Sequence, residues 1–233
     1  MDVVRELQIR RLGAVPYQDA LDLQRALVEE RRADRIPDQL VLLQHPPVIT
    51  LGVKARNDRS HVLASPDVLE EEGVELFESG RGGDVTYHGP GQLVGYPILD
   101  LRPDRCDVHQ YVRDLEEVLI GTAGRFGVTA SRISGLTGVW VGKEKLAAIG
   151  VRIARWITSH GFAFNISTDL RHFNLIVPCG ITDKGVTSLE RLLDRPVPLA
   201  DVEDACIAEF ATVFGRTTTE PDLSLPPLSS VPS

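Results

Sequence analysis

Apolar and polar positions along the chain recur in two rhythms, one typical of β-strands and one typical of α-helices. Alternating or short apolar runs predict strands over residues 6–12, 40–43, 48–51, 74–77, 93–101, 145–153 and 160–166. Helical spacing of apolar residues predicts helices over residues 17–32, 108–126 and 200–214. Short helices are expected to open at Ser65-Pro66 and at Thr187, the second through a capping box with Glu190. This mixture predicts an α/β or α+β fold.

One domain is expected to account for most of the chain. The 233 residues, 42% of them hydrophobic, can form a substantial core, and no internal repeat or linker interrupts them. We therefore expect a single catalytic domain over residues 1–216. Residues 217–233 are rich in Ser, Thr and Pro and are expected to form a disordered tail.

Charge and cysteine content narrow the class of protein. Charged residues interrupt every apolar stretch before it reaches the length of a membrane span, and the N-terminal residues lack the layout of a signal peptide. Three cysteines without a CxxC pair argue against a disulfide framework or a zinc site. The expectation is a soluble cytoplasmic protein that binds neither membrane nor, at a net charge of −8, nucleic acid. Residues 132–195 contain nine Lys or Arg but only five Asp or Glu. This positive excess would suit binding of an acidic protein partner; the alternative is ordinary solvated surface charge.

Cys179 is the candidate nucleophile. A lone cysteine is usually a small buried hydrophobe, and Cys206, on the apolar stripe of the last helix, fits that description. Cys179 differs because Pro178 and Gly180 predict a tight turn, where a side chain can be presented rather than packed. A nucleophilic cysteine must be a thiolate, whereas a thiol with a pKa near 8.5 is only about 3% ionised at pH 7. A nearby cation would lower that pKa.

Lys145 is the candidate cation. On the predicted strand it would share a face with the apolar residues 147, 149, 151 and 153, which would hold its ammonium beside apolar surface. Desolvation there would make proton exchange with a thiol feasible. The alternative is that Lys145 extends from the end of the strand into solvent.

The glycine-rich stretch from residue 80 to 92 is ambiguous by itself. It lacks the Gly-Lys-Ser/Thr ending of a phosphate-binding loop, and Asp84 and His88 alone make a poor metal site. It is either a flexible surface turn or a loop whose backbone approaches a ligand closely. Small residues on two later strands would leave a groove that fits an acyl chain, or would simply permit close packing: Ala148 and Gly150, Gly161 and Ala163.

Four segments, in order, resemble the lipoyl(octanoyl) transferases, also called lipoate-protein ligase B. They are Arg81-Gly-Gly-Asp-Val-Thr-Tyr-His88-Gly-Pro-Gly-Gln92, Gly142-x-x-Lys145-Leu-Ala-Ala-Ile-Gly150, His160-Gly-Phe-Ala-Phe-Asn165 and Pro178-Cys179-Gly180. The resemblance covers about residues 5 to 215. It implies mixed β-sheets flanked by helices, as in the catalytic domain of biotin and lipoate ligases.

The resemblance also implies an activity, the first step of endogenous protein lipoylation. Such enzymes move an octanoyl group from acyl carrier protein to a lysine of a lipoyl domain, through a cysteine acyl-thioester and without a metal or other cofactor. The acceptors are lipoyl domains of 2-oxo acid dehydrogenase E2 subunits and the glycine cleavage H protein. By position, Cys179 matches the nucleophile and Lys145 the lysine that lowers its pKa. The substrate-contacting residues would be Arg81, Gly82, Gly83, Asp84, Val85, Thr86, Tyr87, His88, Ala148, Ile149, Gly150, Gly161, Phe162 and Ala163.

Three other functions are compatible with parts of this pattern. An ATP-dependent lipoate-protein ligase would activate free lipoate, but residues 81–88 contain no extra Lys or Arg to hold phosphates. A cysteine acyl-thioesterase would release free octanoate. A non-catalytic module that binds acyl carrier protein or lipoyl domains would not depend on Cys179.

Overall fold

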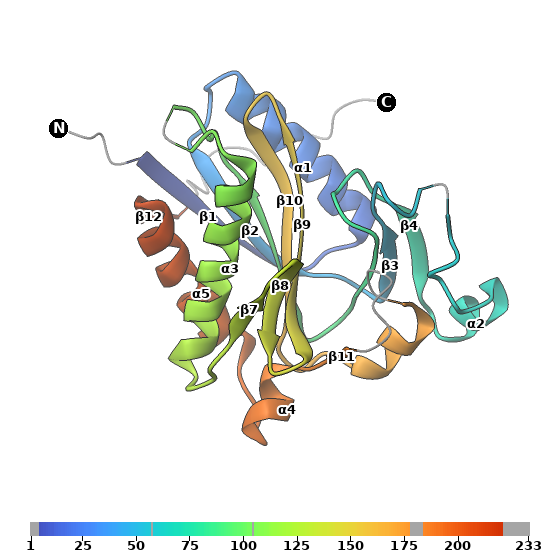
Figure 1. The fold of residues 1–233 in the computed structure, drawn as a ribbon. Helices are drawn as coiled ribbons and strands as arrows, with labels where there is room; N and C mark the ends of the chain where they lie inside the picture. Colours follow the sequence, from blue (N-terminus) through green and yellow to red (C-terminus); the bar gives the residue numbers. More distant parts are fainter. Residues whose placement is uncertain (1–4, 57, 104, 178–183, 221–233) are drawn as a thin grey trace.

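The computed structural model describes residues 5–56, 58–103, 105–177 and 184–220, and its centre is a strongly twisted mixed β-sheet (Figure 1). The strands run in the order β12-β1-β2-β6-β10-β9-β8-β7, with β11 also paired to β9. The β12-β1-β2 and β9-β11 pairs are parallel and the others antiparallel. The strands are β1 (Arg5–Ala14), β2 (Asp38–Gln44), β6 (Gln92–Ile98), β7 (Ser131–Ile133), β8 (Leu136–Val141), β9 (Glu144–Ala154), β10 (Ile157–Asn165), β11 (Gly185–Val186) and β12 (Arg216–Thr219).

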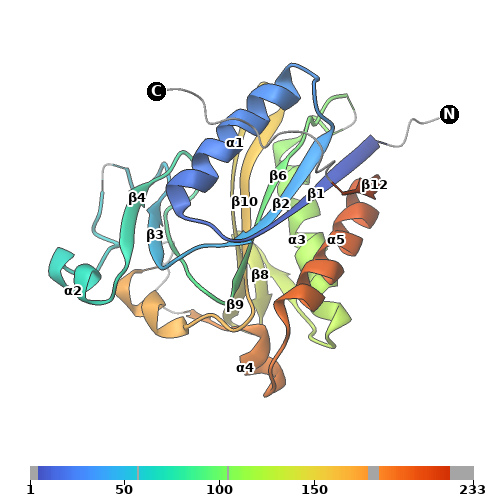
Figure 2. The same ribbon diagram turned by 180° about the vertical axis from the view of Figure 1, so that it is seen from behind.

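Helices cover both faces of this sheet. Helix α1 (Tyr17–Arg32) packs on β6 and β10, whereas α3 (Val108–Arg125) and α5 (Leu199–Phe214) pack together on the opposite face. Figure 2, seen from behind, shows α1 in front of the sheet and α3 and α5 beyond it. The middle of the apolar stripe of α3 is buried in the larger core, where Leu115 and Val118 lie among residues of the sheet and of α5. A smaller apolar cluster lies under α1.

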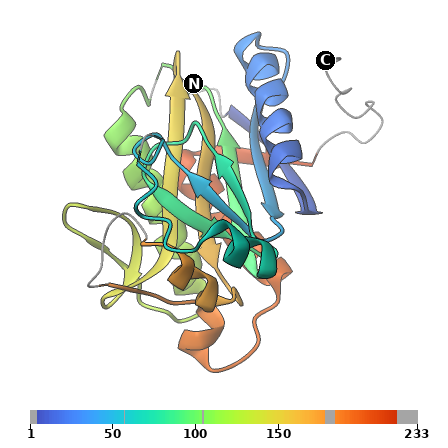
Figure 3. The same cartoon turned by 90° about the vertical axis from the view of Figure 1, so that its right-hand side faces the viewer.

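A second, smaller sheet lies against the first, in front of it in Figure 3. Its order is β4-β3-β5, from β3 (Val48–Leu51), β4 (Glu75–Glu78) and β5 (Val85–His88). Helix α2 (Pro66–Glu71) and the 3₁₀ helix η1 (Leu170–Leu175) share a third apolar cluster with this sheet. Among the described helices, none combines the length with the apolar run that a membrane crossing requires.

The predicted α/β (α+β) class, with mixed sheets flanked by helices, is confirmed, and the differences are local. The strand expected over residues 93–101 ends at Ile98, and the glycine-rich stretch contains the strand β5. The predicted capping box of Thr187 and Glu190 is wrong, because Ser188 is the N-cap of α4 (Leu189–Leu193) and accepts the N–H of Arg191. Glu190 instead accepts the N–H of Val197.

The boundary of the expected disordered tail at residue 217 was also wrong. Thr217–Thr219 belong to β12, because the parallel edge of β1 offers backbone partners to this segment. Disorder of residues 221–233, which lie outside the described residues, stays a prediction.

A buried ionic cluster around Asp38 joins four parts of the chain. The Asp38 side chain is 1% exposed, and its Oδ1 accepts hydrogen bonds from Arg31 Nε at 2.9 Å and from the backbone N–H of Asp100 at 3.0 Å. Its Oδ2 accepts from Arg216 Nε at 3.1 Å. Helix α1, β2, the loop after β6 and β12 therefore meet at one carboxylate.

Removing that carboxylate should destabilise the fold strongly. We expect Asp38→Ala to lower the free energy of unfolding by about 3–5 kcal/mol, because the buried guanidinium groups of Arg31 and Arg216 would lose their common partner. Asp22→Ala is the matched control, since Asp22 pairs with Arg25 on the surface and should change stability by less than about 1 kcal/mol. Urea unfolding checks both values, and equal shifts in the two variants would contradict this account.

Candidate active site

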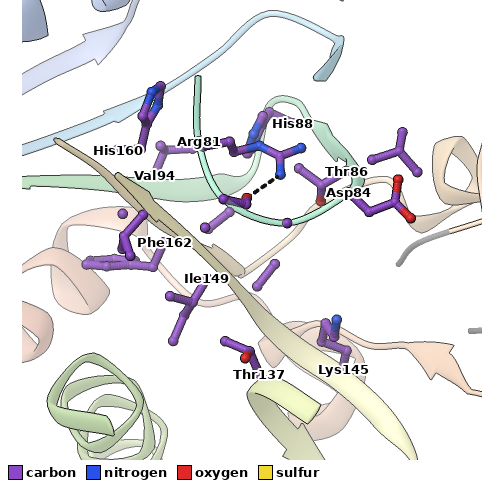
Figure 4. A pocket seen from close by; sticks show the side chains of 18 of the residues that line it. Arg81, Asp84, Thr86, His88, Val94, Thr137, Lys145, Ile149, His160 and Phe162 are labelled. Carbon is purple, nitrogen blue, oxygen red and sulfur yellow. Dashed lines mark hydrogen bonds between the residues drawn. The ribbon is translucent and has the colours of Figure 1, made fainter. Parts of the chain in front are cut away.

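A cavity of about 430 Å³ lies between the glycine-rich segment that precedes β5 and the strands β9 and β10 (Figure 4). Its volume is typical of small-ligand sites. The cavity is lined by Tyr17, Lys54, Arg81, Gly82, Gly83, Asp84, Val85, Thr86, His88, Gln92, Val94, Tyr96, Val112, Gly135, Leu136, Thr137, Lys145, Ala148, Ile149, Gly150, Val151, His160, Gly161, Phe162, Ala163, Asn165, Phe173 and Val186.

The glycine-rich segment is held against β9 by direct backbone contact. The N–H of Gly82 donates to the carbonyl of Val151 at 2.9 Å. A Cβ on Gly150 would lie 2.9 Å from the Gly82 carbonyl oxygen. A Cβ on Gly52 would collide with the Gly83 carbonyl oxygen. The segment is therefore not the flexible surface turn allowed by the sequence, because its backbone forms one wall of the cavity.

Small residues of β9 and β10 form an adjoining wall. Gly150 pairs directly with Gly161 across β9 and β10, and Ala148 pairs with Ala163. All four line the cavity, which supports the groove predicted from their small size. Gly161 also leaves no room for a side chain, because a Cβ there would meet the Gly95 carbonyl oxygen on β6.

Arg81 places a guanidinium group in the cavity wall. The residue is only 7% exposed, and its Nη2 donates to the Thr50 carbonyl oxygen at 2.6 Å and to Thr50 Oγ1 at 2.9 Å. Its Nη1 donates to the carbonyl of Gly82 at 3.1 Å. These bonds fix the guanidinium on β3, so its charge stays at one place in the site.

Neutral histidines surround this end of the cavity. Burial lowers the pKa of His88 to about 3, with nearby His45 contributing, and lowers that of His45 and of His160 to about 4. In neutral His45, Nδ1 must donate to the Val15 carbonyl at 2.7 Å, so Nε2 accepts from the Tyr96 hydroxyl at 2.7 Å. Apart from the fixed Arg81 guanidinium, this end of the cavity therefore presents uncharged side chains.

A chain of side-chain amides links His88 to the segment before α4. His88 Nδ1 donates to Gln92 Oε1 at 2.7 Å, and Gln92 Nε2 donates to Asn165 Oδ1 at 2.9 Å. Asn165 Nδ2 then donates to the carbonyl of Thr187 at 3.0 Å. The backbone N–H of Thr187 in turn donates to the carbonyl of Lys145 at 3.0 Å. This network connects the glycine-rich wall to the strand that carries Lys145.

Lys145 lies at the end of the cavity away from His160 (Figure 4) and is only 8% exposed. Its Nζ lies 4.8 Å from the centre of the Trp140 ring, within the range of a cation–π contact. The alternative that Lys145 extends into solvent is therefore wrong.

The face predicted for Lys145 was also wrong, because a β-bulge intervenes. Lys145 pairs with Trp140, whereas Ala147 pairs with Val139, so one extra residue of β9 falls between the two pairs. Lys145 consequently lies on the other face from Ala147, which packs in the main core. The bulge directs the ammonium toward the cavity.

Cys179 lies outside the described residues, but both flanks of its segment are placed. The N–H of Val177 donates to the carbonyl of His61 at 2.8 Å. After the segment, Gly185 pairs with Glu144 and Val186 pairs with Lys145. The last described residue before Cys179 therefore contacts His61, and the described chain after it pairs with Lys145.

The structure brings the predicted substrate-contacting residues together, with one exception. All of them line the cavity except Tyr87, whose hydroxyl lies 3.0 Å from His172 Nδ1 and whose ring packs against Phe173. Tyr87 alternates with Thr86 and His88 along β5 and packs in the apolar cluster of the small sheet, whereas Val85, which belongs to the same cluster, also reaches the cavity. Residues outside the predicted set that also line the cavity include Tyr17, Tyr96, Thr137 and Val112. Nothing in their sequence neighbourhood marks them, since each comes from a separate element.

Among the described residues, no group of three or more His, Cys, Asp or Glu side chains could hold a metal ion. The prediction that catalysis needs no metal or other cofactor stays a prediction.

The buried histidines should make stability fall in mild acid. In the folded state, His45, His88 and His160 each have a pKa below the unfolded value of about 6.5. The stability that each neutral histidine contributes to the free energy of unfolding is therefore present above pH 6.5 and is lost as the pH falls toward 4. We expect a loss of about 1.4 kcal/mol per histidine between pH 7.5 and 5.5. Urea titrations at the two pH values check this: His88→Gln should reduce the loss by about a third, whereas exposed His109→Gln should leave it unchanged. An unchanged loss in His88→Gln would contradict the assignment.

Comparison with known proteins agrees with this geometry. The family model described as the lipoyl protein ligase A/B catalytic domain matches residues 16–211. An octanoyltransferase of Solibacter usitatus is 52% identical, over 91% of this chain and 94% of that protein. An octanoyltransferase of Myxococcus xanthus is 48% identical over 97% of this chain, which spans 63% of that longer protein. A solved lipoate-protein ligase A bound with ATP shares the fold, with a TM-score of 0.73 at 16% identity, over 94% of this chain and 90% of that one. The chain therefore belongs to the lipoyl protein ligase A/B catalytic-domain family and is an acyltransferase of the octanoyltransferase type within it.

Proposed function

We propose that this chain takes an octanoyl group from acyl carrier protein, holds it as a thioester on Cys179, and passes it to a lysine of a lipoyl domain. One observation carries the proposal: Lys145 is buried in the cavity wall and pairs with Val186, on the segment that returns from Cys179. The small-residue wall of Ala148, Gly150, Gly161 and Ala163 supports the acyl chain as ligand.

The first half-reaction begins with a Cys179 thiolate and a Lys145 ammonium. The thiolate attacks the carbonyl carbon of the donor thioester, and the bond from that carbon to the carrier sulfur breaks. Lys145 gives a proton to the departing carrier thiolate and is left as a neutral amine. Octanoyl-Cys179 and free carrier thiol are the products.

The second half-reaction reverses the role of Lys145. The neutral amine of the acceptor lysine attacks the octanoyl-Cys179 carbonyl, a C–N bond forms, and the C–S bond to Cys179 breaks. Lys145 takes the proton that the new amide nitrogen loses, and the thiolate–ammonium pair is restored. The restored ammonium lies over the Trp140 ring, in a cation–π contact.

The donor and acceptors are proposed from the resemblance and from charge. The donor is octanoyl-acyl carrier protein, and the acceptors are lipoyl domains of 2-oxo acid dehydrogenase E2 subunits and the glycine cleavage H protein. Both groups look acidic in their families, which suits the positive excess between residues 132 and 195. We place the reaction in the cytoplasm, where these partners meet.

The ATP-dependent ligase is the weaker alternative. Relatives about half identical to this chain are named octanoyltransferases, whereas the ATP-bound ligase is 16% identical and shows the fold alone.

The acyl-enzyme should be visible by intact mass. We expect the chain to gain one octanoyl group when mixed with octanoyl-acyl carrier protein, and to lose it on hydroxylamine treatment, because thioesters react with that amine. Cys179→Ala should gain nothing, whereas Cys206→Ala, which removes a buried thiol, should behave like wild type. An intact donor without an adduct would argue for the ligase or for a binding module. Consumption of donor to free octanoate, even with a lipoyl domain present, would indicate a thioesterase.

Lys145 should control the ionisation of Cys179. We expect Lys145→Ala to raise the pH midpoint of Cys179 alkylation by about 1–2 units, because the thiolate would lose its nearby cation. Exposed Lys143→Ala is the matched control and should leave the midpoint in place. A Cys106→Ser background removes the exposed thiol, while burial raises the pKa of Cys206 to about 12 and keeps it unreactive. An unchanged midpoint in Lys145→Ala would remove Lys145 from this role.

A further inference from the structure

We infer that His61, held by Asp84, is a second proton-transfer residue of this site and accepts the first proton of the incoming lysine ammonium. This inference rests on the proposed function, since it concerns the second half-reaction. It assigns a role to two side chains that the thiol–lysine chemistry does not use.

The side chains of His61 and Asp84 form a hydrogen-bonded pair at the cavity wall. His61 Nδ1 lies 2.6 Å from Asp84 Oδ2. Asp84 lines the cavity and is 8% exposed, and its carbonyl accepts the N–H of Gly52 at 2.8 Å, which fixes its backbone. Its second carboxylate oxygen, Oδ1, is buried and has no hydrogen-bond partner among the described residues. The carboxylate therefore has capacity for one more donor, such as an ammonium group.

The orientation of His61 leaves its other nitrogen available. Because a carboxylate can only accept, Nδ1 carries the hydrogen of this bond, and in the neutral ring Nε2 then has the free lone pair. The His61 side chain is 36% exposed, so a protein-borne amine can approach it. A carboxylate bound to Nδ1 stabilises the imidazolium that forms when Nε2 takes a proton.

Backbone pairing places His61 beside the segment that carries Cys179. The carbonyl of His61 accepts the N–H of Val177, two residues before Cys179. Val62 forms an isolated β-bridge with Ile176, and Leu63 N–H donates to the Leu175 carbonyl at 2.9 Å. In Figure 4, Asp84 and Lys145 both lie on the side of the cavity away from His160. The pair is therefore at the reacting end, not at the end with the buried histidines.

A count of protons shows why a second acceptor is needed. A lysine side chain has a pKa near 10.4, so at pH 7 only about one in 2500 is a neutral amine. The acceptor arrives as an ammonium and loses two protons on becoming an amide. Lys145, neutral after the first half-reaction, takes back one of them. His61 Nε2 takes the other before attack, becomes imidazolium, and releases that proton to solvent.

The charges around the pair are consistent with this role. Asp84 is bonded to the ring, and Asp58, which accepts the backbone N–H of Ser60, interacts with the ring electrostatically. Lys54 also lines the cavity. The two carboxylates attract an incoming ammonium group, whereas Lys54 repels it.

The decisive experiment measures the two half-reactions separately. It also compares two acceptors, the charged lysine of a lipoyl domain and the largely uncharged hydroxylamine. Octanoyl-enzyme is formed on wild type and on His61→Gln, and its decay is followed by intact mass with either a lipoyl domain or hydroxylamine. Hydroxylamine is largely uncharged at pH 7, so it needs no acceptor for a first proton. Exposed His109→Gln is the matched control, and Asp84→Asn, which keeps a hydrogen-bond acceptor for His61, is the second variant.

We expect His61→Gln to slow transfer to the lipoyl domain roughly 100-fold at pH 7. Acyl-enzyme formation and hydroxylamine decay should stay within about twofold of wild type. The defect should narrow toward pH 9, because the neutral fraction of the acceptor amine rises about tenfold per pH unit. Asp84→Asn should also slow transfer to the lipoyl domain, by less than His61→Gln.

Two results would overturn this inference but leave the proposed function standing. Equal slowing with both amines, or slower acyl-enzyme formation, would make His61 a structural support of the Val177 segment. A defect that persists unchanged to pH 9 would make it a docking contact for the lipoyl domain. Absence of an acyl-enzyme in wild type would instead overturn the proposed function, and this inference with it.

Discussion

The shape of the cavity depends on three chain segments that approach one another closely at glycine residues. Gly52, the Gly82-Gly83 turn and Gly150 meet at backbone distance, and the Gly82 N–H donates directly to Val151 on β9. This contact docks the small sheet on the large one and converts the space between them into a walled site. A methyl group at Gly150 would be met at 2.9 Å by the Gly82 carbonyl oxygen, so the constraint is steric and local.

The distribution of charge within the cavity follows from desolvation. Burial keeps His45, His88 and His160 neutral at one end, where a hydrocarbon chain would lie. Arg81 is the exception at that end, because its guanidinium is held on β3 by Thr50. Lys145 and Asp84 lie at the other end. An acyl substrate has a matching division, with an apolar tail and a polar thioester.

The reactive end is coupled to the rest of the fold through backbone pairing. The β-bulge at Lys145 turns its side chain out of the main core, and β11 pairs with β9 at that residue. Val177 is tied to His61 on the other side of the Cys179 segment. Both approaches to that segment are thus anchored on elements that also form the cavity. Lys145 and the described residues on either side of that segment are therefore held by paired backbone.

The sequence by itself determined most of the elements and the identity of the chemical groups. Periodicity located α1, α3, α5 and the long strands, because burial of one face imposes a period of 3.6 or 2 regardless of the partner that covers it. The small residues at Ala148, Gly150, Gly161 and Ala163 indicated a groove, since absent side chains leave space wherever the strands pair. Motif order indicated the family.

Only the tertiary structure decided which side chains face the cavity and which distant segments pair, because sequence periodicity does not contain this information. A single extra residue in β9 reversed the face of Lys145, and a free sheet edge recruited Thr217–Thr219, whose composition predicts disorder. Tyr87 turned away from the cavity while Tyr17 and Tyr96 turned toward it. The pairing of His61 with Asp84 joins residues 23 positions apart. Such outcomes depend on contacts between distant segments, and neither the spacing nor the type of a residue records which neighbour the fold will bring to it.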